Sequence, residues 1–400
     1  MIVHNRDIII ITIQPWYYEL GSNCKNIALE LSKNNRVLYV NIPITRKTYY
    51  SSGKSEGIEH HCNIIRGKKN TIEQINENLW QLYPVNLIES INWLPVTGIF
   101  SLVNRINNKR FASDIKKAIS QLGFSNCILF NDNDIYNGFY LKELLQPSLY
   151  IYYMRDFLQG YAFWKKHSSV LEPLLIKKAD LVVTNSLYYK DYSLQFNSNT
   201  RDIGQGCKLD LFNPENENPI PETMKKITKP VIGYTGALDS SRLDLSIIKT
   251  IANSDPEWQI VMVGPEDETF LQSDLHKCSN IHFLGRQPIT ALPAFISSFD
   301  VCINPQKVNP ITSGNYPLKI DEYLAMGKPV VATYTKAMEL FSNHVYLAKT
   351  PDEYPKLLKN ALIQSSEKSQ KAIKFAQSHT WENSVSNLYR AIQDTYMIRR

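Results

Sequence analysis

The segment 317–333, with the sequence PLKIDEYLAMGKPVVAT, constrains the fold of this chain more than any other stretch. Pro317 suits the first turn of a helix, because the N–H that proline lacks would have no partner there. Gly327 can adopt the left-handed conformation that ends a helix, and Pro329 prevents the helix from continuing. A β-branched run typical of a buried parallel strand begins at Val330. The segment therefore predicts a short helix followed directly by a strand inside a sheet.

The predicted helix has one apolar face and one charged face. Ile320 and Leu324 share the first, whereas Lys319 and Glu322 lie together on the second. A helix N-terminus and a lysine neutralise phosphate oxygens, and a glutamate accepts hydrogen bonds from ribose hydroxyls. The pattern therefore indicates a site for a nucleoside diphosphate. The alternative is an ordinary surface ion pair between Lys319 and Glu322, which would contribute little.

The whole segment resembles the nucleotide-sugar signature of two-domain (GT-B) glycosyltransferases of the family 4-like group. In that signature a glutamate, here Glu322, is followed by Tyr-Leu-Ala-x-Gly-x-Pro-Val-Val. The family usually has a second glutamate eight residues earlier, where this chain has Gly314. Residues 14–22 are similar to the opening of bacterial glycosyltransferases of surface polysaccharide assembly, such as those of teichuronic acid pathways. The resemblance implies a sugar-nucleotide donor site, whereas Gly314 leaves open the contacts to the transferred sugar and the stereochemistry.

Strand–helix units repeat in both halves of the chain, beginning with strands predicted at 7–14 and 230–235. This α/β alternation predicts doubly wound parallel sheets with ligands beyond the carboxyl ends of the strands. Four hundred residues are enough for two domains. The resemblance implies two Rossmann-like domains that face each other across a cleft, as in the GT-B fold. The expected parts are an N-terminal acceptor-binding domain (1–205), a linker (206–229), a C-terminal nucleotide-sugar-binding domain (230–378) and a C-terminal helix (379–400) that packs back on the first domain.

The predicted donor-binding residues lie in loops at the carboxyl ends of strands or at the starts of helices. Gly21 and Ser22 precede the first helix, but no GxGxxG pattern accompanies them, so a dinucleotide fingerprint is not indicated. Arg242, near a helix start, is a candidate phosphate clamp, with a solvated surface arginine as the alternative. Gly264 would let the backbone approach a base. The full set is Gly21, Ser22, Gly236, Arg242, Gly264, Asn315, Leu318, Lys319 and Glu322.

Candidate residues for the acceptor side come from the first half. Asp156 is the predicted catalytic base if the reaction inverts configuration, and a helix N-cap or a partner for Arg155 is the alternative. Trp16, Asp132 and Asp134 are predicted to line the acceptor pocket. The two aspartates resemble the DxD metal motif of the other large glycosyltransferase class, but that class has a single nucleotide domain at its N-terminus and would not carry the 317–333 signature. No metal site is therefore predicted.

Charge and cysteine content exclude several classes of protein. The net charge of +6 suits an enzyme that handles sugar diphosphates or rests on anionic lipid, and it does not indicate nucleic acid. Six scattered cysteines without a CxxC pair predict reduced thiols rather than a zinc site or a disulfide framework.

No secretory pattern opens the chain, and the apolar stretch 93–103 is shorter than the ~20 residues of a spanning helix. We expect a cytoplasmic protein, peripheral on the inner face of the plasma membrane, with 86–110 either a rim helix or a membrane or lipid-acceptor patch.

The resemblance implies a metal-independent enzyme, a glycosyltransferase of the hexosyl type, in cell-surface polysaccharide synthesis. It implies no cofactor, a UDP-, GDP- or dTDP-sugar as donor, and a saccharide or lipid-linked acceptor. Two alternatives stay open. A nucleotide-sugar 2-epimerase shares the donor domain, and an inactive nucleotide-sugar-binding partner of a synthase would be consistent with Gly314.

Overall fold

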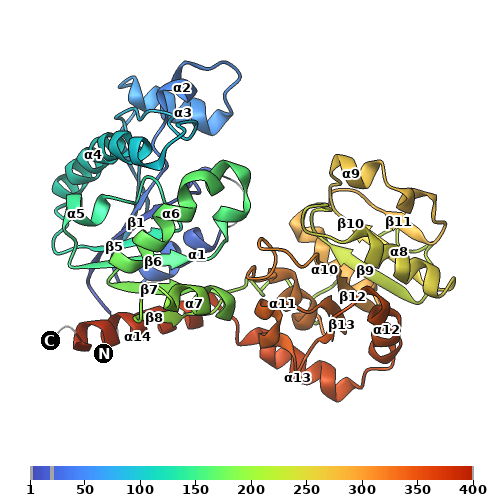
Figure 1. Cartoon of the computed structure of the whole chain (residues 1–400). Coiled ribbons are helices and arrows are strands. Elements are labelled where there is room, and N and C mark those ends of the chain that lie inside the picture. The colour runs from blue at the N-terminus through green and yellow to red at the C-terminus, as the bar shows by residue number, and fades with distance from the viewer. Residues whose placement is uncertain (1–2, 19–21, 399–400) are drawn as a thin grey trace. The chain divides into compact units, whose positions relative to one another are not determined.

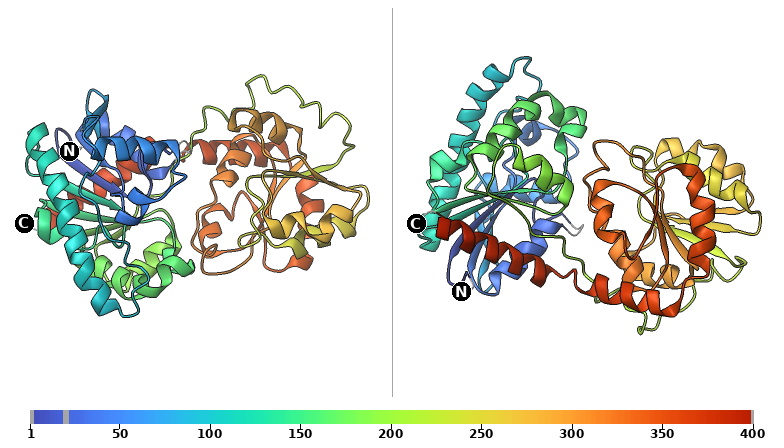
Figure 2. Two further views of the ribbon diagram at one scale, coloured as in Figure 1. Left: turned by 90° about the horizontal axis from the view of Figure 1, so that it is seen from above. Right: turned by 60° about the horizontal axis from the view of Figure 1, so that its bottom comes forward.

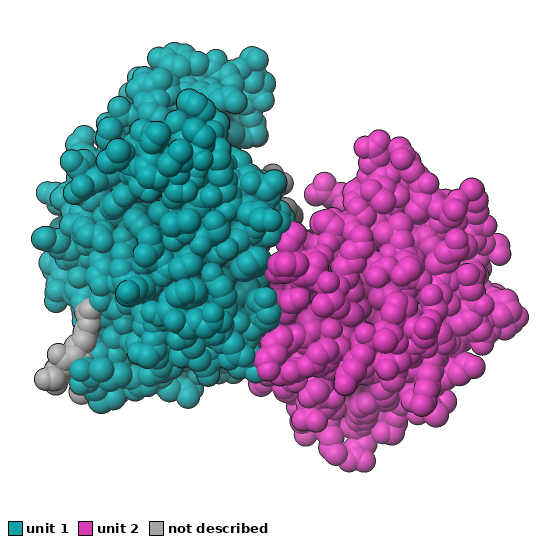
Figure 3. Space-filling model, viewed as in Figure 1, with its two compact units in different colours: residues 1–204, 381–400 teal, residues 205–380 magenta. Residues whose placement is uncertain are grey.

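The computed structural model describes residues 3–18 and 22–398. The chain divides into two compact units, which we call unit 1 (residues 1–204 with 381–400) and unit 2 (residues 205–380) (Figure 3). Each unit is an α/β sandwich around one sheet, so the predicted pair of Rossmann-like domains is confirmed (Figure 1). No helix in the described part of the chain is both long enough and apolar enough to cross a membrane.

Unit 1 has an eight-stranded sheet in the order β3-β4-β2-β1-β5-β6-β7-β8, parallel except for the antiparallel pair β3 and β4. Its strands are β1 (Asp7–Thr12), β2 (Arg36–Val40), β3 (Ile72–Asn76), β4 (Leu79–Leu82), β5 (Ile128–Asp132), β6 (Leu149–Met154), β7 (Leu181–Thr184) and β8 (Thr200–Asp202). Its helices are α1 (Asn23–Ser32), α2 (Arg46–Tyr50), α3 (Glu56–Ile65), α4 (Thr97–Leu122), α5 (Leu141–Leu145), α6 (Ala162–Lys178), α7 (Leu187–Leu194) and α14 (Trp381–Ile398).

The central strands of unit 1 are apolar on both faces because helices cover both sides of the sheet. Ile9 and Ile11 of β1 pack into one core, with α4 and α6. Ile8 and Ile10 pack into the other, with α1 and α14. The chain passes from β1 to β2 on one side and later enters β5 on the other side of β1. Ligands of such sheets bind beyond the carboxyl ends at this reversal of strand order.

Unit 2 has a fully parallel six-stranded sheet in the order β11-β10-β9-β12-β13-β14. Its strands are β9 (Val231–Thr235), β10 (Gln259–Val263), β11 (Ile281–Phe283), β12 (Val301–Asn304), β13 (Val330–Thr333) and β14 (Tyr346–Ala348). Its helices are α8 (Leu245–Ser254), α9 (Glu268–Leu271), α10 (Leu292–Ser298), α11 (Leu318–Ala325), α12 (Tyr354–Leu362) and α13 (Ser366–Gln377).

The segment 317–333 forms the predicted helix and strand as α11 and β13. Pro317 is the N-cap of α11, one residue earlier than predicted. Gly327 has a φ of +68°, which a glycine adopts without the steric penalty of a side chain. Residues 206–229, predicted as a linker, instead pack on unit 2, where Phe212 and Met224 are buried in its core. Apolar side chains within this polar stretch explain the difference.

Helix α14 is the last element of the chain and belongs to unit 1. Its apolar stripe of Trp381, Val385, Leu388 and Ile392 is buried in the core that also contains α1. Figure 2 shows this dark red helix alongside the strands of unit 1. The spacing of the stripe explains the packing, since residues three and four apart share one face of a helix.

Truncating this stripe should destabilise unit 1. We expect Leu388→Ala to lower the free energy of unfolding by about 2 to 5 kcal/mol, because it leaves a cavity in the core. Met397→Ala, at an exposed position of the same helix, should change it by no more than about 0.5 kcal/mol. Urea unfolding followed by tryptophan fluorescence measures both. Equal effects of the two substitutions would show that α14 is not part of the core.

Candidate active site

Two glycine loops in unit 2 lie directly against each other at the carboxyl ends of β9 and β10. The Gly236 N–H donates to the carbonyl oxygen of Val263 at 2.9 Å. A Cβ on Gly264 would lie 1.9 Å from the carbonyl oxygen of Gly236, so no side chain fits there. Gly236 has a φ of +127°, and a Cβ on it would lie 2.8 Å from Nζ of Lys319. The two glycines therefore bring bare backbone next to the start of α11.

Lys319, the second residue of α11, lies over an aromatic ring rather than in an ion pair. Its Nζ is 3.9 Å from the centroid of the Tyr234 ring and donates a hydrogen bond to the Tyr234 hydroxyl. Burial, reinforced by the positive charge of Arg242 and opposed by Glu322, lowers the pKa of Lys319 to about 7. No sequence pattern indicates a role for Tyr234, which lies on β9.

Glu322 lies one turn after Lys319 on the same helix. Burial raises the pKa of Glu322 to about 7; the Asp321 charge acts in the same direction and Lys319 opposes it. Both side chains are half-buried, and among the ion pairs of the described residues none joins them. The ordinary surface ion pair considered from the sequence is therefore not what the structure has. A cation and a carboxylate with separate positions can each bind a different part of a ligand.

The other predicted donor residues of unit 2 lie around these two. Arg242 is 3.8 Å from Asp239 in a partly exposed ion pair, and its charge acts on Lys319. Leu318 is the exposed first residue of α11. Asn315 is half-buried, and its N–H donates to the Thr312 carbonyl oxygen at 3.3 Å.

A buried network that sequence reasoning missed anchors α11. The carboxylate of Asp321 is fully buried; it accepts a hydrogen bond from the Tyr316 hydroxyl at 2.7 Å and lies 2.7 Å from Nδ1 of His379. Burial raises the pKa of Asp321, and its bond to His379 opposes that rise. On another face of α11, the Tyr323 hydroxyl accepts a hydrogen bond from the Thr235 N–H at 2.8 Å. The helix is therefore tied to β9 and to the segment that leads into α14.

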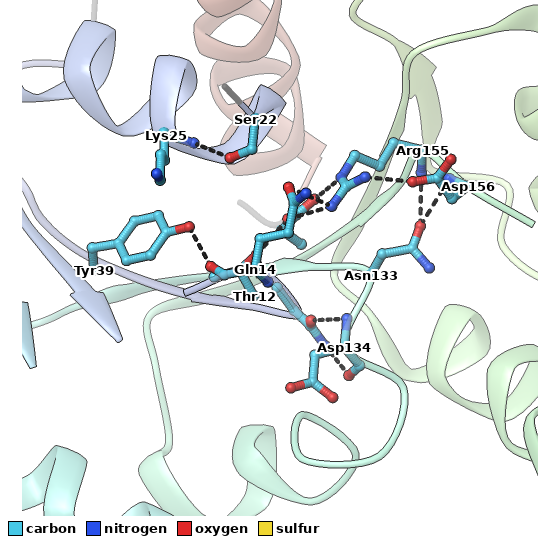
Figure 4. A network of polar contacts seen from close by, with 11 residues as sticks. Thr12, Gln14, Ser22, Lys25, Tyr39, Asn133, Asp134, Arg155 and Asp156 are labelled. Carbon is cyan, nitrogen blue, oxygen red and sulfur yellow. Dashed lines mark hydrogen bonds and ion pairs between the residues drawn. The ribbon is translucent and has the colours of Figure 1, made fainter. Parts of the chain in front are cut away.

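A second polar cluster lies at the carboxyl edge of the unit 1 sheet (Figure 4). Arg155 holds the fully buried carboxylate of Asp132 through Nε at 2.6 Å and a terminal nitrogen at 3.2 Å. The Thr12 hydroxyl donates to the same carboxylate at 2.6 Å. The Asn133 side-chain oxygen accepts from the N–H groups of Arg155 and Asp156, at 2.8 and 3.1 Å.

These contacts change the interpretation of three predicted acceptor-side residues. Both oxygens of the Asp132 carboxylate already accept hydrogen bonds from Arg155 and Thr12. Asp134 is also buried and accepts two hydrogen bonds from Asn137, both at 2.9 Å, while burial raises its pKa to about 6. Neither carboxylate lines an accessible pocket. Strand-end aspartates look the same in a sequence whether they face solvent or a buried arginine.

Asp156 remains partly accessible, with 31% of its side chain exposed, but it forms an ion pair with Arg155. An ion pair with Arg155 is one of the alternative roles that the sequence predicts for Asp156. An acceptor hydroxyl would have to compete with the guanidinium for this carboxylate.

The remaining predictions fall in the first loop. Trp16 is half-buried, its backbone N–H donates to the Asn41 side-chain oxygen at 2.6 Å, and its ring packs edge-on against Tyr39. Ser22 caps α1 by accepting from the Lys25 N–H at 3.1 Å. Gly21 lies outside the described residues. Within residues 3–18 and 22–398, no three His, Cys, Asp or Glu side chains gather into a group that could hold a metal ion.

The buried network predicts a specific stability effect. Asp321→Ala should lower the free energy of unfolding of unit 2 by about 2 to 5 kcal/mol, because it removes the buried carboxylate that binds both the Tyr316 hydroxyl and the His379 ring and leaves these two groups only their contact with each other. Asp274→Ala removes an exposed aspartate of the same unit that pairs with Lys277, and should cost less than about 1 kcal/mol. Thermal unfolding followed by circular dichroism compares the two. Similar losses would contradict the assigned role of Asp321.

Comparisons with known proteins agree with this geometry. Residues 229–367 match the family described as "Glycosyl transferases group 1", a range that contains every predicted donor residue of unit 2. TuaH of Bacillus subtilis (strain 168), a protein named as a teichuronic acid biosynthesis glycosyltransferase, is 27% identical over 179 residues. That match covers 43% of this chain and 44% of TuaH.

Solved structures share the fold over the whole chain. Sucrose-phosphate synthase from Thermosynechococcus elongatus is 14% identical with a TM-score of 0.65, over 99% of this chain and 98% of that one. HepE from Anabaena in complex with UDP is 14% identical with a TM-score of 0.65, over 97% and 100%. Residues 229–367 therefore match the group 1 glycosyltransferases, and the chain as a whole has the two-domain GT-B fold of the solved structures.

Proposed function

We propose that this chain transfers a sugar from a nucleoside diphosphate sugar to a saccharide or lipid-linked acceptor in the synthesis of a cell-surface polysaccharide. The observation that carries the proposal is the edge of unit 2, where Lys319 and Glu322 of α11 lie beside bare backbone at Gly236. The named role of TuaH in teichuronic acid biosynthesis supports the polysaccharide pathway.

The geometry suits the charge changes of glycosyl transfer. As the bond to the sugar breaks, negative charge builds up on the departing diphosphate, and preorganised positive groups stabilise it most effectively away from water. The N-terminus of α11, the ammonium of Lys319 and the guanidinium of Arg242 are these groups in the proposal. Glu322, one turn along, accepts hydrogen bonds from the ribose hydroxyls. The proposed reaction therefore uses neither a metal ion nor a cofactor.

The donor is proposed to be a UDP-sugar, with GDP- and dTDP-sugars as the other members of the class. The HepE structures contain UDP and UDP-glucose. For an inverting reaction the proposed base is Asp156, because it alone among Asp132, Asp134 and Asp156 keeps an exposed carboxylate. The proposed location is the cytoplasm, at the inner face of the plasma membrane.

A second candidate function is an inactive nucleotide-sugar-binding partner of a synthase. It is favoured by Gly314 at the position of the family's other glutamate. Incubation with UDP-, GDP- and dTDP-sugars separates the two functions, since an enzyme releases the nucleoside diphosphate slowly even to water and an inactive binder does not.

The charge of Lys319 should set the pH dependence of nucleotide binding. At pH 6, Lys319→Met should weaken UDP binding about 10- to 100-fold, because a charge-assisted contact to phosphate is lost. In the unliganded protein the pKa of Lys319 is about 7, and a bound diphosphate raises this pKa. Above pH 7, nucleotide binding is therefore accompanied by the uptake of a proton on Lys319. The advantage of the wild type over Lys319→Met should therefore shrink by up to about tenfold per pH unit above 7.

Isothermal titration calorimetry at pH 6, 7.5 and 9 measures this effect. Lys336→Met, which removes a lysine of unit 2 paired with Glu339, is the control and should follow the wild type. The ionisation of UDP itself affects the wild type and Lys319→Met equally, so it cancels in the ratio of their dissociation constants. A constant ratio of dissociation constants across this pH range would contradict the role of Lys319.

Replacing the proposed base separates chemistry from binding. Asp156→Asn should lower turnover at least about 100-fold, the usual contribution of general base catalysis, while the UDP dissociation constant stays near that of the wild type. Product release from the active donor and calorimetric titration with UDP provide the two measurements. Full turnover in this variant would remove Asp156 from the mechanism.

A further inference from the structure

Helices α4 and α6 of unit 1 pack against each other and expose large apolar side chains. Leu102 and Ile106 of α4 and Phe163 of α6 are exposed. Trp93, in the loop that precedes α4, is also exposed, with 72% of its surface accessible. Lys166 of α6 donates to the carbonyl oxygen of Trp93 at 3.0 Å, which joins the loop to the helix. We call the exposed surface of α4, α6 and this loop the α4/α6 face. Exposed apolar residues of this size on two neighbouring helices indicate an interaction surface.

The charges of the α4/α6 face have one sign. The basic residues of the two helices are Arg105, Lys109, Arg110, Lys116 and Lys117 on α4, and Lys165, Lys166, Lys177 and Lys178 on α6. Their carboxylates are Asp114 and Glu172, and both are buried. Glu89 and Glu143 from neighbouring segments pair with Arg110 and Lys178, which leaves exposed lysines along both helices.

This combination matches the chemistry of an anionic lipid surface. Lysines contact negative head groups, and Trp, Phe and Leu side chains enter the boundary between head groups and acyl chains. An acidic protein partner would match the lysines, but it would not require apolar side chains exposed to this extent on both helices. The exposed apolar side chains beside the lysines therefore favour a membrane leaflet as the occupant.

A cavity of about 240 Å³ lies next to this face, beyond the carboxyl ends of β1, β2 and β5. Its lining is mainly apolar and includes Ile13, Ile42, Phe100, Tyr136, Phe163 and Trp164. Phe163 belongs both to the lining and to the exposed face. Pockets for whole drug-sized ligands measure roughly 300 to 1,000 Å³, so this one suits a short apolar segment of a larger molecule.

One polar atom of the cavity has an unused hydrogen-bonding position. Asn92 lines the cavity, its side-chain nitrogen donates to the carbonyl oxygen of Phe163, and its side-chain oxygen is buried without a hydrogen-bond partner. A bound molecule with a hydroxyl at the edge of its apolar segment would supply the missing donor.

We propose that unit 1 docks on an anionic membrane through the α4/α6 face and takes the apolar segment nearest the head group of a lipid-linked acceptor into this cavity. The inference rests on the proposed glycosyl transfer and narrows its acceptor to a lipid-linked one. The position of the cavity at the reversal of strand order, where α/β sheets bind ligands, places this segment at the acceptor side of unit 1.

Vesicle flotation with the whole chain tests the docking. Vesicles of phosphatidylcholine with 30% phosphatidylglycerol are the probe, and phosphatidylcholine alone is the reference. We expect binding to the anionic vesicles that is at least tenfold tighter and weakens with salt. Lys109→Glu/Lys116→Glu/Lys165→Glu should abolish it. Lys226→Glu/Lys249→Glu/Lys356→Glu, the same charge change on exposed lysines of unit 2, should preserve it.

A second triple variant tests the apolar contribution. Trp93→Ser/Leu102→Ser/Phe163→Ser should lose most vesicle binding, whereas Leu271→Ser/Ile289→Ser/Ile363→Ser, at exposed positions of unit 2, should not. Equal binding by the α4/α6 variants and their controls would overturn the docking surface.

The cavity has its own measurement. A short isoprenoid phosphate, used below its micelle concentration, should bind saturably in isothermal titration calorimetry. Ile42→Trp, which fills the cavity, should weaken this binding at least tenfold without changing vesicle flotation. Unchanged isoprenoid binding in Ile42→Trp would overturn the cavity assignment.

Titration of every variant with UDP keeps the two proposals separate. A chain that binds UDP but ignores anionic vesicles and the isoprenoid phosphate would overturn this inference and leave the glycosyltransferase proposal standing. A chain that binds the lipids but no nucleoside diphosphate would overturn the glycosyltransferase proposal instead.

Discussion

The anchoring of α11 is the interaction on which the rest of the site depends. Lys319 and Glu322 keep half-buried charges on one face of a helix only eight residues long. So short a helix has little stability of its own. Its position comes from the buried carboxylate of Asp321 and from the Tyr323 hydroxyl, which join it to His379 and to Thr235. The face of α11 that carries Lys319 and Glu322 is therefore held in place by contacts of the other faces of the helix with the protein.

The electrostatics of this arrangement favour a charged ligand. Half-burying a lysine and a glutamate without pairing them directly shifts both pKa values towards neutrality. A bound diphosphate would restore the positive charge of Lys319, and ribose hydroxyls would donate to Glu322. The two groups are poorly solvated, and the nucleoside diphosphate sugar proposed as the donor would satisfy both.

Local patterns in the sequence predicted the elements well where they were strong. Proline and glycine around a short amphipathic run predicted α11 and β13, and continuous β-branched runs predicted the buried strands of both sheets. Residues 44–80 gave no such pattern, because β3 is a partly exposed antiparallel strand at the edge of the sheet. Lys319 and Glu322 could be selected because both are local to one helix.

Contacts between distant residues could not be predicted in the same way. His379 reaches Asp321 across 58 residues, and nothing near either residue indicates the pair. The sequence predicts that Asp132 faces an acceptor, but its carboxylate binds Arg155, which lies 23 residues later in the chain. Burial therefore separates structural from functional carboxylates, and burial depends on the whole fold. A crystal structure of the chain with UDP is the most direct test. It should place the phosphates at the N-terminus of α11, within hydrogen-bonding distance of Lys319, and the ribose against Glu322. A nucleotide bound away from both side chains would contradict the proposed donor site.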